Sequence, residues 1–149
     1  MWLLPALLLT LSAHAEETDE ARRQALRLRM SVRHAAPTCD TIDALTPDPV
    51  ADLIWLMDHV EQPPWVGMRA AECIIANHAE AETVRLHQWV ADPDRKGLML
   101  MILSRLDKLP EPLAHSLAKA TLAGPHRELA RPRLMRSNHV PVRALVEPE

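Results

Sequence analysis

Proline-bearing breaks divide most of this chain into apolar helical stretches at a regular interval. They fall at residues 62–64, 92–94 and 124–126, which read Gln-Pro-Pro, Asp-Pro-Asp and Gly-Pro-His. Successive breaks are about 30–32 residues apart, and each lies between two stretches whose apolar residues recur at helical spacing. A period of this length is typical of proteins in which stacked helix pairs bury a continuous core. We therefore predict an all-α fold.

The residue content agrees with this fold class. The chain of 149 residues has no Phe or Tyr, and it contains 13 Pro against 3 Gly. Sandwiches and barrels depend on aromatic and β-branched strands and on glycine-rich turns, so they are disfavoured. A formal net charge of −3 argues against a general nucleic-acid-binding protein.

Several helix ends can be predicted from local signals. Residues 18–35 read as an arginine-rich amphipathic helix that Pro37 stops. Asp48-Pro49 and Asp92-Pro93 each place a capping carboxylate before a proline, so we expect helices to begin at these two pairs. The stretch 126–136 has a helical pattern that Pro132 should kink.

The first residues have the pattern of a secretory signal peptide. Residues 2–11 are almost wholly apolar, and Ala13-His14-Ala15 is a small-x-small cleavage site. The apolar stretch is too short to span a bilayer, and no other stretch reaches transmembrane length. We therefore expect a signal peptide over 1–15, an amphipathic helix over 16–37 and a repeat domain over 38–149. The processed chain would be periplasmic or secreted, after cleavage at Ala15.

The two cysteines agree with export. Cys39 and Cys73 both lie in the expected mature part, and an even number in an oxidising compartment favours one disulfide. Such a bridge would close a loop of about 34 residues and stabilise the fold by roughly 3–4 kcal/mol. Two unpaired cysteines, with Cys73 acting as a small buried apolar residue, are the alternative.

One segment points to a family. Residues 64–74 read Pro-Trp-Val-Gly-Met-Arg-Ala-Ala-Glu-Cys-Ile, which resembles the second-helix pattern of short HEAT repeats. Gly67 departs from that pattern, because arginine is usual there. The resemblance covers roughly 48–146 and implies a right-handed α-solenoid of about three helix pairs, preceded by the arginine-rich helix. A compact helical bundle with proline-rich turns is the alternative architecture.

The resemblance also implies a function, since such repeats present binding surfaces. We expect an exported, non-enzymatic scaffold that binds a protein or peptide partner and needs no cofactor. The residues predicted to contact the partner are Trp65, Arg69, Glu72 and Trp89. The sequence contains no nucleophile elbow and no glycine-rich phosphate loop, so no catalytic residue is predicted.

Two further patterns are relevant to partners. The alternative function is a periplasmic metal-binding protein that uses His59, His78 and His87 with nearby methionines. Charge is also uneven along the chain, because residues 38–94 contain eleven acids and two arginines, whereas residues 124–143 contain five arginines and one glutamate. Such asymmetry can steer the choice of partner, although both basic segments could equally be solvated faces.

Overall fold

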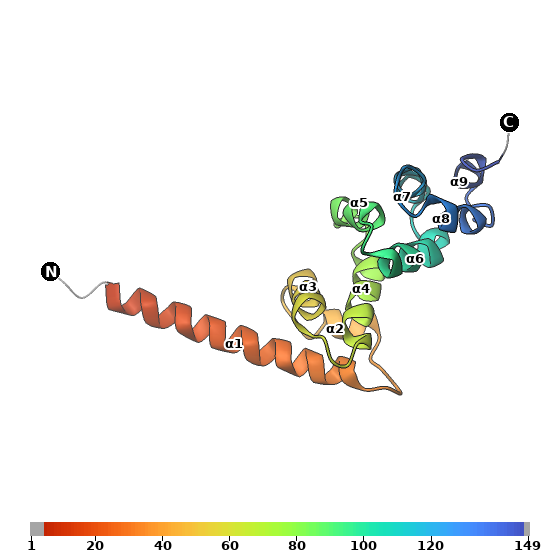
Figure 1. Ribbon diagram of the computed structural model, residues 1–149. Helices are drawn as coiled ribbons and strands as arrows, with labels where there is room; N and C mark the ends of the chain where they lie inside the picture. The colour runs from red at the N-terminus through yellow and green to blue at the C-terminus, as the bar shows by residue number, and fades with distance from the viewer. Residues whose placement is uncertain (1–4, 148–149) are drawn as a thin grey trace. The chain divides into compact units, whose positions relative to one another are not determined.

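The computed structural model describes the backbone of residues 5–147 and the side chains of residues 18–147. This part of the chain consists of helices and connecting turns and has no strand (Figure 1). The all-α prediction is therefore confirmed. The predicted signal peptide, residues 1–15, and its cleavage at Ala15 lie outside the residues whose side chains are described.

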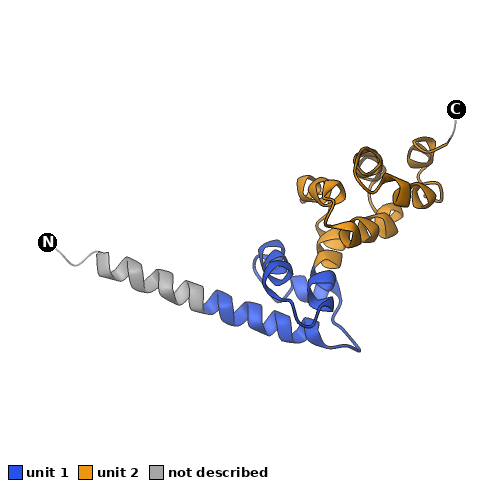
Figure 2. Cartoon of the chain, viewed as in Figure 1, with its two compact units in different colours: residues 1–70 blue, residues 71–149 orange. Residues whose placement is uncertain are grey.

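The chain divides into two compact units, Met1–Ala70 and Ala71–Glu149 (Figure 2). The division falls within α4 (Trp65–Asn77). The first unit contains the start of α4 and the helices before it: α1 (Pro5–Ser31), α2 (Cys39–Asp43) and α3 (Pro49–His59). The second contains the rest of α4 (Trp65–Asn77), followed by α5 (Thr83–Ala91), α6 (Lys96–Arg105), the 3₁₀-helix η1 (Leu106–Lys108), α7 (Glu111–Ala123), α8 (Arg127–Leu134) and α9 (Val140–Ala144).

In the first unit, α1 packs against α3. Their fully buried residues include Leu26 of α1 and Leu56 of α3. The predicted start of α3 is confirmed, because Asp48 is the N-cap and its carboxylate accepts a hydrogen bond from the backbone N–H of Ala51 at 3.2 Å. Pro49 occupies the first helical position, where a missing N–H costs nothing.

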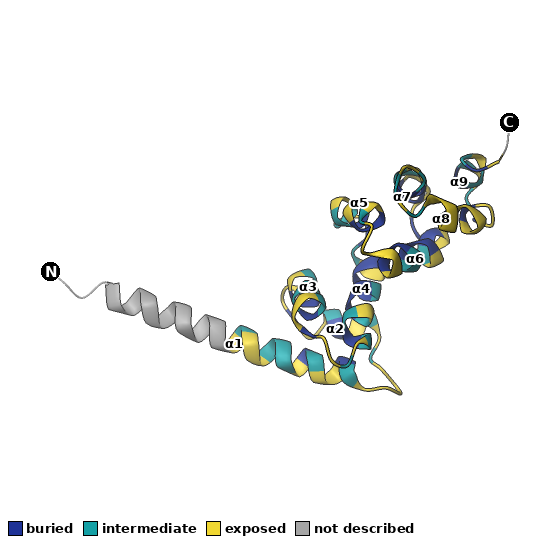
Figure 3. Cartoon of the chain, in the orientation of Figure 1, coloured by how far each residue is buried: buried dark blue, intermediate teal, exposed yellow. Residues whose placement is uncertain are grey.

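In the second unit, neighbouring helices pair and alternate helices stack. α5 contacts α6 and α7 contacts α8, while α5 also packs on α7, α7 on α9, and α6 on α8. Buried apolar residues line the inner faces (Figure 3): Leu86, Met99, Ile102, Leu117 and Leu134. Gly124 ends α7 at a close approach, since a Cβ there would lie 3.3 Å from the carbonyl oxygen of Val90.

Two helix limits differ from the prediction, and one short helix was not predicted. The helix expected at Asp92-Pro93 begins at Lys96 instead, because the Asp92 carboxylate accepts from the N–H of Asp94 at 2.9 Å and shapes a turn there. The first helix, expected to reach residue 35, ends at Ser31. The five-residue α2 was not predicted.

Both cysteines of the chain are disulfide-bonded, which confirms the Cys39–Cys73 bridge. Cys39 is the first residue of α2, and Cys73 lies in α4 with 4 % of its surface exposed. Across the described residues, none of the helices is both long enough and apolar enough to cross a membrane.

Candidate functional site

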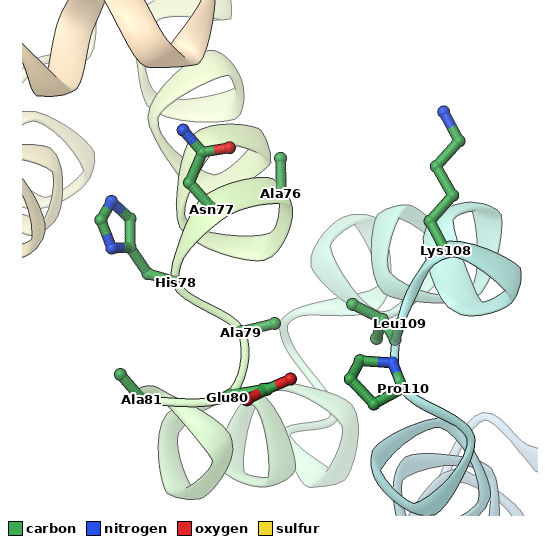
Figure 4. A pocket seen from close by; sticks show the side chains of 9 residues that line it. All are labelled: Ala76, Asn77, His78, Ala79, Glu80, Ala81, Lys108, Leu109 and Pro110. Atoms are coloured by element: carbon green, nitrogen blue, oxygen red, sulfur yellow. The ribbon is translucent and has the colours of Figure 1, made fainter.

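A cleft of about 450 Å³ opens in the second unit, where the turn after α4 faces the start of α7 (Figure 4). Its wall is formed by two short segments: residues 76–81 and residues 108–110. Ala79, Leu109 and Pro110 give it an apolar centre, and Lys108 and Glu80 add opposite charges at its edges. Lys108 and Glu80 are both exposed.

Local hydrogen bonds set the shape of this cleft. After α4, the N–H of His78 donates to the carbonyl of Ile74 and the N–H of Glu82 donates to the carbonyl of His78, both at 2.9 Å. On the other wall, the N–H of Leu109 donates to the carbonyl of Leu106 at 3.1 Å and closes η1. Pro110 then caps α7. These bonds fix the backbone of both walls of the cleft.

Two of the residues predicted to bind a partner, Trp65 and Arg69, contact the end of α1. The indole Nε1 of Trp65 donates to the carbonyl of Ser31 at 3.2 Å. One guanidinium nitrogen of Arg69 donates to the carbonyls of Met30 and Val32. The last carbonyls of a helix have no partner within the helix, so these bonds satisfy them. The two side chains hold the end of α1 in place.

The other two predicted partner-binding residues, Glu72 and Trp89, also make internal contacts. Glu72 forms an ion pair with Arg105 of α6. Trp89 is buried in the core, with 5 % of its surface exposed, because its indole lies on the inner face of α5. Trp89 therefore offers almost no surface to a partner, and none of the four predicted residues lines the cleft.

The three histidines of the metal hypothesis lie in different environments and make separate contacts. His59 stacks on Trp55, with ring centroids 4.8 Å apart, and its Nδ1 donates to the Trp55 carbonyl. His87 donates from Nδ1 to the Thr83 carbonyl, and its Nε2 hydrogen-bonds the hydroxyl of Ser116 on α7 at 2.5 Å. His78 lines the cleft. Among residues with described side chains, no three His, Cys, Asp or Glu come together as a metal site.

A buried carboxylate in the first unit was not predicted as a functional or structural centre. Asp52 of α3 has no exposed surface, and Arg22 donates to it from Nε at 2.6 Å and from Nη2 at 3.0 Å. Arg23 donates from Nε at 3.0 Å, and the hydroxyl of Thr46 donates at 2.5 Å. We call these four residues the Asp52 cluster; it joins the arginine-rich part of α1 to α3.

The electrostatics of the Asp52 cluster favour its charged form. Burial by itself raises the pKa of Asp52, but the hydrogen bonds from Arg22, Thr46 and Arg23 outweigh that effect and bring the pKa below its ordinary value of 3.8. The same bonds raise the pKa of Arg22, so the pair stays ionised. The carboxylate therefore stabilises the folded state through its charge.

This depressed pKa predicts a pH dependence of stability. An acid whose pKa is lower in the folded state stabilises the fold fully above its unfolded pKa, about 3.9, and loses that contribution as pH falls through the folded pKa. We expect Asp52→Asn to be less stable than the parent chain at neutral pH, and the difference to shrink below about pH 4. Urea unfolding of both chains from neutral to acid pH measures it. A difference that stays constant into strong acid would contradict the assignment.

Comparison of the chain with protein-family models, with curated proteins and with solved structures finds no match.

Proposed function

We propose that this chain is an exported, non-enzymatic scaffold of HEAT-like helical repeats that binds a protein or peptide partner. The observation that carries the proposal is the packing order of the second unit from α5 onward, in which α5 contacts α7, α6 contacts α8 and α7 contacts α9. α5, α7 and α9 form one series and α6 and α8 form the other. Alternation between two series of helices is how a solenoid of helix pairs buries its core.

The spacing of the helices supports the repeat interpretation. α4, α6 and α8 begin at Trp65, Lys96 and Arg127, so each starts 31 residues after the one before. Side chains about one period apart are also hydrogen-bonded. His87 reaches Ser116 across 29 positions, and Asp107 accepts from the Ser137 hydroxyl across 30 positions at 2.6 Å. Contacts between neighbouring repeats stabilise such arrays.

The disulfide supports export. Disulfides persist in oxidising compartments and are rare in the cytosol, where thiols are kept reduced. A bridge between Cys39 and Cys73, in a chain whose residues 1–15 have a signal-peptide pattern, fits a protein that works in the periplasm or outside the cell.

The cleft at residues 76–81 and 108–110 is the binding surface that we assign to this scaffold. It lies where the turn between α4 and α5 meets the segment between η1 and α7. Its apolar centre takes a side chain, while Lys108 and Glu80 can pair with charges on either side of it. A peptide that binds here in an extended conformation needs no catalytic residue from the protein.

Peptide selection tests this function. Panning the purified chain against displayed random peptides of about a dozen residues should enrich sequences that bind with roughly micromolar affinity. The charge swap Glu80→Lys with Lys108→Glu keeps the net charge and should weaken the selected peptide by about tenfold, because both edges of the cleft are reversed. Calorimetry measures the dissociation constants.

The matched control is the swap Asp94→Lys with Lys119→Glu, which reverses two exposed charges that do not line the cleft. It should leave the affinity within about twofold of the parent value. Equal weakening by both swaps would show a general charge effect and would contradict the cleft assignment. Failure to enrich any peptide would contradict the scaffold function.

A further inference from the structure

α8 carries a surface of concentrated positive charge in the second unit. Four arginines lie on it or directly after it, and all four are exposed: Arg127, Arg131, Arg133 and Arg136. Glu128 is the one acid on the helix, and its pair with Arg127 lies in solvent, with side chains 76 % and 66 % exposed. A pair so exposed contributes little energy, so the helix presents a strong net positive charge.

Apolar side chains lie among these arginines. Ala130 and Leu134 are buried and define the inner side of α8, whereas Leu129 is 40 % exposed and Met135, directly after the helix, is 54 % exposed. At 100° per residue, Leu129 and Met135 lie about 120° apart, one on each side of the outward direction, with Arg133 beside Leu129 and Arg131 beside Met135. Figure 3 shows most of the visible surface of α8 as exposed. We call these six residues, the four arginines with Leu129 and Met135, the α8 surface.

The arginines of the α8 surface keep most of their hydrogen-bonding capacity. Arg133 donates from Nη1 to the carbonyl of Leu129 at 3.4 Å, and Arg136 donates from Nε to the carbonyl of Pro132 at 3.1 Å. A guanidinium group has five N–H donors in a planar fork that matches a carboxylate. One bond to the helix backbone therefore orients the guanidinium groups of Arg133 and Arg136, and their remaining N–H donors can bind a ligand.

We propose that the α8 surface binds an acidic, amphipathic segment of a protein partner. Carboxylates of that segment would pair with Arg131, Arg133 and Arg136, and its apolar residues would cover Leu129 and Met135. Arginine and methionine are enriched in protein interfaces, and charge complementarity sets partner choice. A membrane-surface helix needs a broad apolar face, whereas α8 offers two exposed apolar side chains over about two turns. This surface is separate from the cleft and does not depend on the function proposed for it.

The experiment uses the full chain and a fluorescent helical peptide built from glutamate and leucine. A control peptide has the same sequence with glutamine in place of every glutamate. We expect saturable binding of the glutamate peptide by anisotropy, weakened at least tenfold between about 50 and about 300 mM salt. The triple variant Arg131→Gln, Arg133→Gln, Arg136→Gln should weaken it by about tenfold more. The glutamine peptide should not saturate.

The matched control removes three positive charges from other exposed positions: Arg29→Gln, Lys96→Gln and Lys119→Gln. It should change affinity by less than about threefold, since net charge alone acts weakly at this range. All six positions are exposed, and unchanged helical circular dichroism checks that both variants fold. Equal loss in both variants would overturn the proposal.

Three other results would also overturn it. The first is a peptide result: either the glutamate peptide does not bind at low salt, or the glutamine peptide binds with the same affinity as the glutamate peptide. The second is flotation with anionic phosphatidylglycerol vesicles that the triple variant loses, without peptide binding, which would assign the surface to lipid. The third is self-association in sedimentation velocity that the triple variant abolishes, which would make the occupant a second copy. The cleft swap Glu80→Lys with Lys108→Glu should not alter binding of the glutamate peptide. Failure of the cleft proposal can therefore be distinguished from failure of the α8 proposal.

Discussion

Replacing Asp52 with alanine is expected to lower the free energy of unfolding by about 2–4 kcal/mol. The carboxylate has no exposed surface and accepts four hydrogen bonds, from Arg22, Arg23 and Thr46. Alanine would remove the shared acceptor of two partly buried guanidinium groups and one buried hydroxyl, and Arg22 would keep only its ion pair with Asp19. Because unsatisfied buried groups cost more than a bond contributes, the loss should exceed the value of a single bond.

Urea unfolding at neutral pH measures this effect. Tryptophan fluorescence is a suitable probe, since Trp55 lies beside the cluster, with the guanidinium carbon of Arg23 5.5 Å from its ring centroid. Limited proteolysis of α1 provides a second readout, because the Asp52 cluster joins α1 to α3. We expect α1 to be cut faster in the variant.

Asp58→Ala is the control, since Asp58 is an exposed aspartate on the same helix. Its unfolding free energy should stay within about 0.5 kcal/mol of the parent value. If Asp52→Ala and Asp58→Ala unfolded at the same urea concentration, the cluster would contribute nothing to stability. The unfolding free energy of Asp52→Asn should lie between those of Asp52→Ala and Asp58→Ala, because the amide keeps the shape and one acceptor oxygen but loses the charge.

Local signals predicted the parts of the fold that depend on neighbouring residues. Apolar periodicity gave the helices, and the aspartate-proline pair at 48–49 marked the start of α3 because a capping bond spans three residues. The prediction from the same pair at 92–93 was wrong, because α6 begins at Lys96. There the carboxylate bonds two residues ahead and makes a turn, a competing use of the same side chain.

The candidate sites depend on contacts that no local pattern contains. Asp52 looked like one more acid in an acid-rich stretch, and its role arises from arginines about 30 positions earlier in the chain. Arg69 looked like a surface residue, yet it bonds the last carbonyls of α1. The nine residues that line the cleft lie at helix ends and in short turn segments, and three of them are alanines, so they carry little signal in a sequence. Periodicity predicts which residues turn inward, and it does not predict which polar groups meet there.

Removal of the disulfide should have an effect of similar size. The double variant Cys39→Ser, Cys73→Ala is expected to lose about 3–4 kcal/mol of stability, because the unfolded chain regains the freedom of a loop of about 34 residues. Alanine is chosen at position 73 because the side chain there is 4 % exposed and a hydroxyl would be buried. The melting temperature should fall by roughly 10–15 °C.

Reduction of the parent chain gives an independent test of the same bridge. Adding dithiothreitol should lower the melting temperature of the parent chain to near that of the double variant, and it should leave the double variant unchanged because no bond is left to reduce. Intact mass before and after reduction reports the two hydrogens gained. A parent chain that gains both hydrogens and still melts at its original temperature would mean that the bridge restricts an unfolded state already held compact by other contacts. In that case the disulfide would be a marker of the compartment in which the chain folds, and the stability of the fold would come from helix packing and from polar contacts such as the Asp52 cluster.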